Sequence, residues 1–363
     1  MKKVFINMML ASLISFNFAC KKKEIEVPGF VWVAQTEFTE EVVSPDGIVY
    51  RPKLKLLDDV LYVCHNKGIF SKKLNEEGSK WELFAFGGLP IIEFVKNGDK
   101  ILAISHGSKN HNDSLLFLSN DNGKTYVNFS SPDLLKNEPN YVCGECNILY
   151  RIAQHPQNAD IVLVFTHYGV SISEDFGLTW KSLNESNFGG QNWHLGFHPL
   201  DANTIFYSGE HLNCVGALYK SSDYGNTWSV YNTPVGDNCV HSIAFHPTNP
   251  NILIYSGEGV MGKSTDKGKT WKEMDLRETA MYFYKVLFDE DTPEILYASG
   301  AKGHAVNDSV WVYRSTDTGE SWHLAFHEKL NENIWAVVDM VKHKNKLFFY
   351  SYASGIIELE LEF

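Results

Sequence analysis

The chain has 363 residues, of which 44% are hydrophobic and 13% aromatic, so it can bury one large core or two ordinary ones. Its formal net charge of −12 argues against nonspecific binding to nucleic acid or to an anionic membrane surface. No low-complexity segment interrupts the sequence, so a folded globular body is expected.

The first 29 residues differ from the rest. MKK is followed by the apolar run VFINMMLASLISFNFA, which is too short for a comfortable membrane span, and then by Cys20. This order resembles a bacterial lipoprotein signal, which implies that residues 1–19 are removed and that Cys20 is acylated. Residues 20–29 would then be a tether that holds residues 30–363 in the bacterial cell envelope, at the outer membrane, with membrane contact through the anchor only. An ordinary secretory signal, with Cys20 as a bystander, is the alternative.

A short motif repeats along residues 30–363. Its copies are SNDNGKTY (119–126), SEDFGLTW (173–180), SSDYGNTW (221–228), STDKGKTW (264–271) and STDTGESW (315–322), and a degenerate copy, EEGSKW, ends at Trp81. The closing aromatics at 81, 126, 180, 228, 271 and 322 are 45, 54, 48, 43 and 51 residues apart, a period typical of repeat architectures. Within a copy we expect Asp to accept backbone N–H groups, Gly to take positive φ, and Trp to be the first core residue of the outgoing strand.

This Ser-x-Asp-x-Gly-x-Thr-Trp pattern resembles the Asp box, or BNR repeat, of sialidases, related glycosidases, sortilin-type domains and photosystem assembly factors. All of these are β-propellers. The resemblance covers about residues 30–363, and it implies a fold and not a reaction.

The segments around each box predict the rest of a blade. In the fifth unit VHSIAFHP, NILIYSG, VMGKS and TWKEMD read as four short strands. After Trp322, IWAVVDMVKH, KLFFYSYA and GIIELELEF supply three more strands, and FVWVAQT at 30–36 supplies a fourth. We therefore predict an all-β, seven-bladed β-propeller of four-stranded antiparallel blades, with the last blade closed by both chain termini. Six blades with an appendage are the alternative.

A four-stranded meander places its 1–2 and 3–4 turns on one face and its 2–3 loops on the other. The Asp boxes are 3–4 turns, so their Asp and Ser side chains are expected to serve the fold. On the opposite face, the ends of the second strands in five consecutive blades carry ionisable groups: His65, His106, His167, Glu210 and Glu258. Tyr168 and His211 follow directly, and the first strands place Arg151, His194, His241 and Lys285 near the central channel. Convergent titratable groups in a concavity predict a functional site, whereas scattered, solvated rim residues are the alternative.

These residue types favour acid–base chemistry on an anionic glycan. The catalytic candidates are His106, His167, Tyr168, His194 and His211, because His and Tyr can transfer protons. The substrate-binding candidates are Arg151, Lys285, His65, Glu210 and Glu258, of which the two cations would hold a uronic carboxylate. The expected reaction is β-elimination, and in residue types alone the set is similar to that of seven-bladed propeller polysaccharide lyases. The protein is expected to be a monomer whose partner is the glycan, without nucleic acid.

Three other functions remain open. A sialidase needs three arginines at its site, but this chain has only four in all, and Pro52 directly follows Arg51 where those enzymes carry Arg-Ile-Pro. A two-carboxylate glycosidase could use Glu210 and Glu258. A non-catalytic glycan-binding or assembly propeller would need no acid–base group.

Cysteine chemistry adds one further alternative. Once Cys20 is set aside, five cysteines remain: Cys64, Cys143, Cys146, Cys214 and Cys239. Two disulfides are the simplest interpretation for an exported protein, and Cys64 is expected to be a buried strand residue. No cofactor is required, although Cys143 and Cys146 have the Cys-x-x-Cys spacing of half a zinc site.

Overall fold

A computed structural model gives the fold of the chain. It describes the backbone of 30–36 and residues 53–105, 116–129, 149–166, 169–185, 192–210, 216–232, 239–275, 281–302, 309–329, 337–351 and 355–361. No helix in these described ranges is long and apolar enough to cross a membrane.

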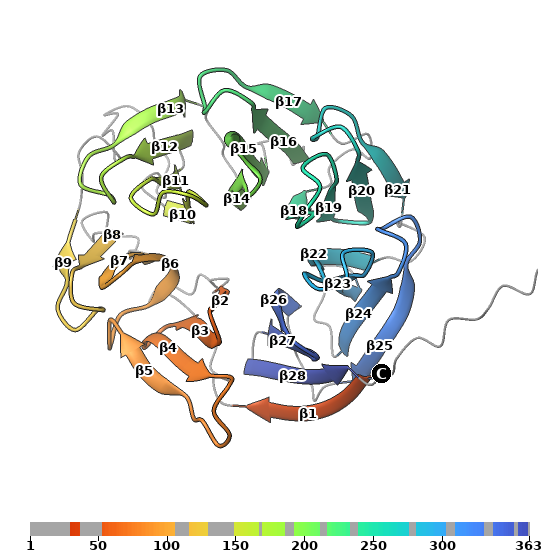
Figure 1. The fold of residues 1–363 in the computed structure, drawn as a ribbon, viewed down its shortest axis with the longest axis horizontal. Coiled ribbons are helices and arrows are strands. Elements are labelled where there is room, and N and C mark those ends of the chain that lie inside the picture. Colours follow the sequence, from red (N-terminus) through yellow and green to blue (C-terminus); the bar gives the residue numbers. More distant parts are fainter. Residues whose placement is uncertain are drawn as a thin grey trace, which may run out of the picture.

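Seven four-stranded antiparallel sheets surround a central axis, so the prediction of seven blades is confirmed (Figure 1). In blades 1 to 3 the strands are β2 (Leu54–Leu57), β3 (Val60–His65), β4 (Gly68–Lys73) and β5 (Glu82–Ala85); β6 (Ile91–Asn97), β7 (Lys100–Ser105), β8 (Leu116–Ser119) and β9 (Val127–Asn128); and β10 (Leu149–Gln154), β11 (Val162–Thr166), β12 (Gly169–Ser173) and β13 (Lys181–Glu185). In blades 4 and 5 they are β14 (Asn192–His198), β15 (Asp201–Glu210), β16 (Gly216–Ser221) and β17 (Ser229–Asn232); and β18 (Val240–Phe245), β19 (Leu253–Gly257), β20 (Val260–Ser264) and β21 (Lys272–Asp275). In blades 6 and 7 they are β22 (Met281–Phe288), β23 (Leu296–Lys302), β24 (Ser309–Ser315) and β25 (His323–Lys329); and β26 (Val337–His343), β27 (Lys346–Ser351), β28 (Gly355–Leu361) and β1 (Phe30–Thr36).

The seventh sheet combines segments from far apart in the sequence. β1 lies at its outer edge and pairs antiparallel with β28, from Phe30 opposite Leu361 to Thr36 opposite Ile356. The first strand of every blade lies nearest the axis (Figure 1), so β2, β6, β10, β14, β18, β22 and β26 border the centre.

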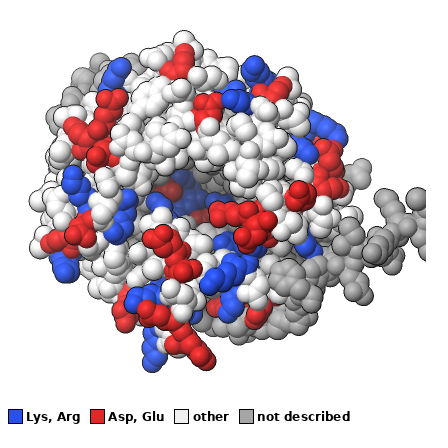
Figure 2. Space-filling view, viewed as in Figure 1, with Lys and Arg blue, Asp and Glu red and all other residues white. Residues whose placement is uncertain are grey.

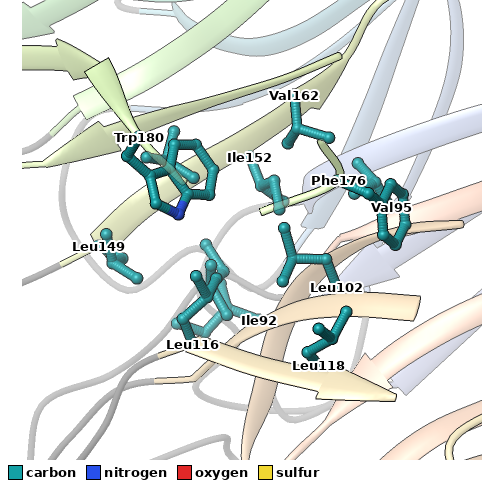
Figure 3. Packing of buried hydrophobic residues seen from close by; sticks show 12 residues of the cluster. Ile92, Val95, Leu102, Leu116, Leu118, Leu149, Ile152, Val162, Phe176 and Trp180 are labelled. Carbon is teal, nitrogen blue, oxygen red and sulfur yellow. The ribbon is translucent and has the colours of Figure 1, made fainter. Parts of the chain in front are cut away.

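The hydrophobic core is divided among the seven interfaces between neighbouring blades. Second strands such as β11 and β19 are buried along their whole length because another blade covers each face. Figure 3 shows the interface between blades 2 and 3, where Leu102 and Leu118 of one blade pack with Phe176 and Trp180 of the other. A similar cluster joins blade 7 to blade 1, so the ring of cores is closed.

The Asp boxes have the same hydrogen bonds in each of the five intact copies. In the first, the Oδ1 of Asp121 accepts the N–H of Thr125 at 2.8 Å, and its Oδ2 accepts the Thr125 hydroxyl at 2.6 Å. The hydroxyl of Ser119 donates to Asp121 and accepts the N–H of Gly123. The hydrogen bonds from Thr125 are the main reason that the pKa of Asp121 falls to about 2. The carboxylates of the boxes therefore hold turns together.

The geometry of each box also explains why the motif contains a glycine and a tryptophan. The glycine has positive φ, as predicted, and the residue before it does too: φ is 59° at Tyr224 and 85° at Gly225. A Cβ on Gly225 would lie 2.6 Å from the side chain of Leu183 in the preceding blade, so the turn needs a residue without a side chain. The outgoing strand begins one residue later than predicted, at Lys181 in blade 3, and Trp180 closes the turn by donating from Nε1 to the carbonyl of Gly177.

A cavity lies beside the degenerate box of blade 1, near the packed seam with blade 7. Gly78 has φ of 74°, but a Cβ there would meet no atom within 4 Å. The cavity, of about 470 Å³, lies between the hairpin at Lys72–Ser79 and the turn at His343–Lys346. The glycine of the degenerate box therefore lacks the close contact with the preceding blade that Gly225 makes.

Candidate functional site

The innermost strands share an irregularity that sets up the site. In β6, β10, β14, β18, β22 and β26 the pairing with the second strand shifts by one residue near the start of the strand, as in a β-bulge. The residues just past these shifts occupy equivalent positions in six blades, and Lys53 lies just before β2 in the seventh. We refer to this set as the channel ring: Lys53, Glu93, Arg151, His194, Ser242, Lys285 and Asp339.

Several members of the channel ring bind the backbone of the next blade. Asp339 accepts the N–H of Leu54 at 2.9 Å. Glu93 accepts the N–H of Ile152 at 3.2 Å, and Arg151 donates from Nε to the carbonyl of Trp193 at 3.1 Å. These side chains therefore hold the blades in register as well as bordering the channel.

Cations outnumber anions in the channel ring. The Nζ of Lys285 lies 3.1 Å from the Oδ1 of Asp339, which is almost wholly buried. Burial lowers the pKa of Lys53 to about 8; Arg151 and Lys285 act in the same direction, against Asp339 and Glu93. Figure 2 shows basic and acidic side chains inside the hollow at the centre of the molecule. Three cations face two carboxylates here, so the ring favours an added anion.

His194 is neutral in this environment. Burial lowers its pKa to about 3, and the positive charges of Lys285, Lys53 and Arg151 act in the same direction. An imidazole with this pKa is neutral at neutral pH, so it keeps one N–H but is neither an imidazolium acid nor a strong base. In the free protein His194 can therefore offer a hydrogen bond more readily than it can transfer a proton.

At each shift in pairing, one residue of the inner strand has no partner position on the second strand. In blades 4, 5 and 6 these residues are Trp193, His241 and Tyr284, which we call the aromatic row. These three side chains come from equivalent positions in blades 4, 5 and 6. The ring of His241 lies parallel to that of Tyr284, with centroids 4.7 Å apart, and its centroid is 4.1 Å from the centroid of Trp193. The row packs three blades together beside the channel ring.

Of the five residues expected at the ends of the second strands, two have described side chains. Glu258 follows β19 and is buried, with its Oε1 3.4 Å from the Nε2 of His241. His65 ends β3, but only 2% of it is exposed, and its Nδ1 accepts the N–H of Lys67 in its own turn. A substrate-binding role for His65 stays a prediction.

Several predicted residues lie outside the part of the chain that the structure describes: Cys20, His106, Cys143, Cys146, His167, Tyr168, His211 and Cys214. The side chain of Glu210, at the end of β15, is also not described. Cys64 is buried in β3, as predicted. The described residues contain no group of three or more potential metal ligands, so the zinc alternative stays a prediction.

Arg314 bears on the sialidase alternative. It lies in β24, the third strand of blade 6, and its guanidinium is 6.0 Å from the ring of Tyr297 in β23. It is therefore away from the channel ring, as the sequence predicted. Arg51 and Arg277 lie outside the described residues, so Arg151 is the one arginine that the described part of the chain places at the channel.

Five residues at or beside the channel were not predicted from the sequence: Lys53, Glu93, Asp339, Trp193 and Tyr284. Aligning the first strands of all blades in one column would have found Glu93 and Asp339 beside Arg151 and Lys285. The same alignment sets Trp193, His241 and Tyr284 in the column just before, but their packing against one another depends on the shifts in strand pairing and is not visible in the sequence.

Comparisons with known proteins agree with this fold. The Sortilin-Vps10 family (sortilin, neurotensin receptor 3) matches residues 216–356, which include the boxes of blades 4, 5 and 6. A search of curated protein sequences gave no match.

Three solved structures are similar. The GH74 xyloglucanase from Xanthomonas campestris is 14% identical, with a TM-score of 0.65 over 91% of this chain and 53% of that one. YCF48 from Cyanidioschyzon merolae is 12% identical, with a TM-score of 0.62 over 92% of this chain and 99% of that one. The extracellular domain of the putative one component system BT4673 from B. thetaiotaomicron is 12% identical, with a TM-score of 0.59 over 91% of this chain and 40% of that one.

The chain spans about half of the xyloglucanase and about a third of an ancestral GH74 enzyme, of which it covers 34%. At these identities the likenesses concern the fold alone. Together with the family match over residues 216–356, they agree with a β-propeller fold.

Proposed function

We propose that this propeller is a carbohydrate-active protein that binds an anionic glycan, one bearing uronic carboxylates, at the channel ring. The observation that carries the proposal is the surplus of cations there, with the pKa of Lys53 lowered to about 8 mainly by burial and also by Arg151 and Lys285. The chain as a whole has a net charge of −12, so this positive region is local. A carboxylate placed beside Lys53 would relieve the repulsion among the three cations.

β-Elimination is the reaction that these residues favour. Cations would offset the charge of the uronate, a base would take the C5 proton, and an acid would protonate the leaving oxygen. His106, His167, Tyr168 and His211 remain the candidates for proton transfer. We assign His194 a binding role, because its pKa of about 3 makes it a weak base.

The likeness to a GH74 xyloglucanase supports a carbohydrate substrate but not this reaction class. Hydrolysis would need the same general acid and would differ in its product. The two are distinguished by incubating the protein with a panel of uronate-containing and neutral oligosaccharides. Elimination predicts ultraviolet absorbance from a C4–C5 double bond, whereas new reducing ends without that absorbance would support a glycosidase.

The site is tested by the variant Lys53→Met, with Lys100→Met as its matched control. Lys100 is exposed at the start of β7, away from the channel. Lys53→Met should weaken binding of the anionic oligosaccharide about tenfold, and Lys100→Met should leave it unchanged. Equal binding by wild type and Lys53→Met, or equal binding of neutral oligosaccharides, would overturn the proposal.

Export with a lipid anchor at Cys20 belongs to the same proposal. Its support is the order of the first 20 residues: a basic start, an apolar run and a cysteine. Metabolic labelling with a fatty acid should mark the wild type and not Cys20→Ala. Label on both proteins, or on neither, would contradict acylation at this residue.

A binding platform is the second candidate, because the likeness to YCF48 covers nearly all of both chains. A YCF48 structure bound to D1 peptide is also similar to this fold. Saturable binding of an anionic glycan without any product from the panel would favour this candidate over the enzyme.

A further inference from the structure

The cavity between blades 7 and 1 lies away from the channel ring. Its volume is about 470 Å³, and it is bordered by the hairpin at 72–79 in blade 1 and by the turn at 343–346 in blade 7. The first connects β4 to β5 and the second connects β26 to β27, so both lie at the end of the blades that carries the Asp boxes. The channel ring lies at the other end of the inner strands. A cavity of this size can hold a small polar molecule.

Lysines outnumber carboxylates around the cavity, because four lysines and three glutamates line it. Two of the lysines are neutralised in ion pairs. The Nζ of Lys73 lies 2.8 Å from the Oε1 of Glu76, and the Nζ of Lys346 lies 2.6 Å from the Oε1 of Glu358. The other two lysines therefore decide which charge the cavity can accept.

These two lysines, Lys72 and Lys344, come from different blades. Lys72 belongs to β4 of blade 1 and Lys344 to the turn of blade 7, and neither has a carboxylate at ion-pair distance in the described part of the chain. Leu74 and Phe348 pack in the core between the two blades and also line the cavity. Lysine ammonium groups bind phosphate as point charges, so this lining suits a phosphate attached to an apolar portion.

The chain enters the fold close to this cavity. Phe30, the first residue of β1, lies opposite Leu361, the last residue of β28, at the outer edge of blade 7 (Figure 1). The N–H of Leu361 donates to the carbonyl of Asn345, which lines the cavity. Neighbouring strands are about 4.8 Å apart, so the backbone at Phe30 lies about 10 Å from the turn at 343–346.

The proposed lipid anchor would hold this end of the propeller near a bilayer. Residues 20–29 connect Cys20 to Phe30, and an extended chain spans at most about 3.6 Å per residue, so the anchor lies within about 36 Å of Phe30. Lysines 21–23 directly follow Cys20, and basic residues next to a membrane attract anionic lipids. Anionic headgroups would thus surround the end of the propeller at which the cavity lies.

We propose that the cavity between blades 7 and 1 binds the phosphate of an anionic membrane lipid, and that Lys72 and Lys344 hold it. The choice of a lipid rests on the anchor of the proposed function, whereas the site rests on the cavity. Binding there would turn the Asp-box end of the propeller toward the bilayer. The channel ring, at the opposite end, would then open away from the membrane and toward a glycan.

Vesicle binding by the chain without its anchor tests this site. Residues 20–363 with Cys20→Ala contain every described residue but lack the apolar run and the acylated cysteine. In flotation, this protein should bind vesicles of phosphatidylcholine with phosphatidylglycerol more tightly than vesicles of phosphatidylcholine alone. Adding Lys72→Met and Lys344→Met should weaken this binding about tenfold or more, because both cations contribute.

The matched control is the double variant Lys124→Met with Lys269→Met in the same background. Both lysines are exposed in Asp boxes, those of blades 2 and 5, so the same charge is removed at the same end of the propeller. The control should bind vesicles as the parent protein does. Lys344→Met alone removes an exposed side chain, and it should lose binding several-fold even where Lys72→Met destabilises the fold.

Equal losses in both double variants, or no preference for phosphatidylglycerol in the parent protein, would overturn the cavity as a lipid site. Glycerol phosphate distinguishes a lipid from a free phosphate ester. If it binds through Lys72 and Lys344 while vesicles do not, the lipid is overturned and the ligand is a soluble ester. If fatty-acid labelling shows no acylation at Cys20, the anchor fails, while the vesicle measurement still decides on the cavity. The two failures are therefore distinguishable.

Discussion

The Asp boxes and the channel ring both place charged groups at equivalent positions in successive blades, but they differ in how much those groups vary. Every intact box has the same Asp, and its carboxylate accepts the same bonds from the residue four positions later, as at Asp121 and Asp223. The channel ring holds lysine, glutamate, arginine, histidine, serine, lysine and aspartate in turn. Repetition of one chemistry indicates a role in the fold, and variation at equivalent positions indicates a site.

The largest expected effect is on the stability of the fold, through an Asp-box tryptophan. Trp180 is buried between blades 2 and 3 and closes its box through the bond to Gly177 (Figure 3). Trp180→Ala should lower the free energy of unfolding by about 3–5 kcal/mol, because it opens a cavity in this core. Denaturant unfolding measures the loss. A loss below about 1 kcal/mol would mean that the box aromatics are not core residues.

Alanine substitutions at two glycines distinguish the destabilisation caused by backbone strain from the destabilisation caused by a steric collision. Gly225 and Gly78 have similar φ, 85° and 74°, so an alanine costs similar strain at both. Only Gly225→Ala also collides with the preceding blade, at Leu183, and it should therefore be the more destabilising by about 1–3 kcal/mol in urea unfolding. Equal losses would show that the seam at blade 1 is as tight as the others.

The smallest expected effect concerns the pH dependence of stability. The folded pKa of His194 is about 3, well below the ordinary value near 6.5, so acidification protonates the unfolded chain first. Stability is thus lost as pH falls from about 6.5 toward 3. In His194→Gln this loss should be smaller by roughly 1.4 kcal/mol at pH 5.5, measured by denaturant unfolding. Identical pH profiles for the two proteins would contradict a buried neutral imidazole.

Sequence patterns predicted the fold well because the boxes mark each blade. The turn around Asp223 and Gly225 is held by hydrogen bonds to a residue only four positions after the Asp. Such a turn can therefore be recognised from the spacing of a few neighbouring residues. The candidate site was predicted only in part: Arg151, His194, His241 and Lys285 were placed near the channel, but the pairing of His241 with Glu258 was not. That contact depends on a shift in strand pairing and on 16 intervening residues, and neither is encoded by local spacing.

Lys53 illustrates the same limit. It lies outside the repeat motif, and its unusual state arises from burial and from Arg151 and Lys285 in blades 3 and 6. Such a pKa depends on the closure of the whole ring, which no segment of the sequence contains.

The most direct test of the site is the pH dependence of anion binding. With the pKa of Lys53 at about 8, binding of a uronate oligosaccharide to the wild type should weaken by about tenfold between pH 7 and pH 9.5, as Lys53 loses its proton. Titration calorimetry should give a weaker and nearly pH-independent affinity for Lys53→Met. A wild-type affinity that stays constant over this range would contradict the account of the channel ring as an anion site.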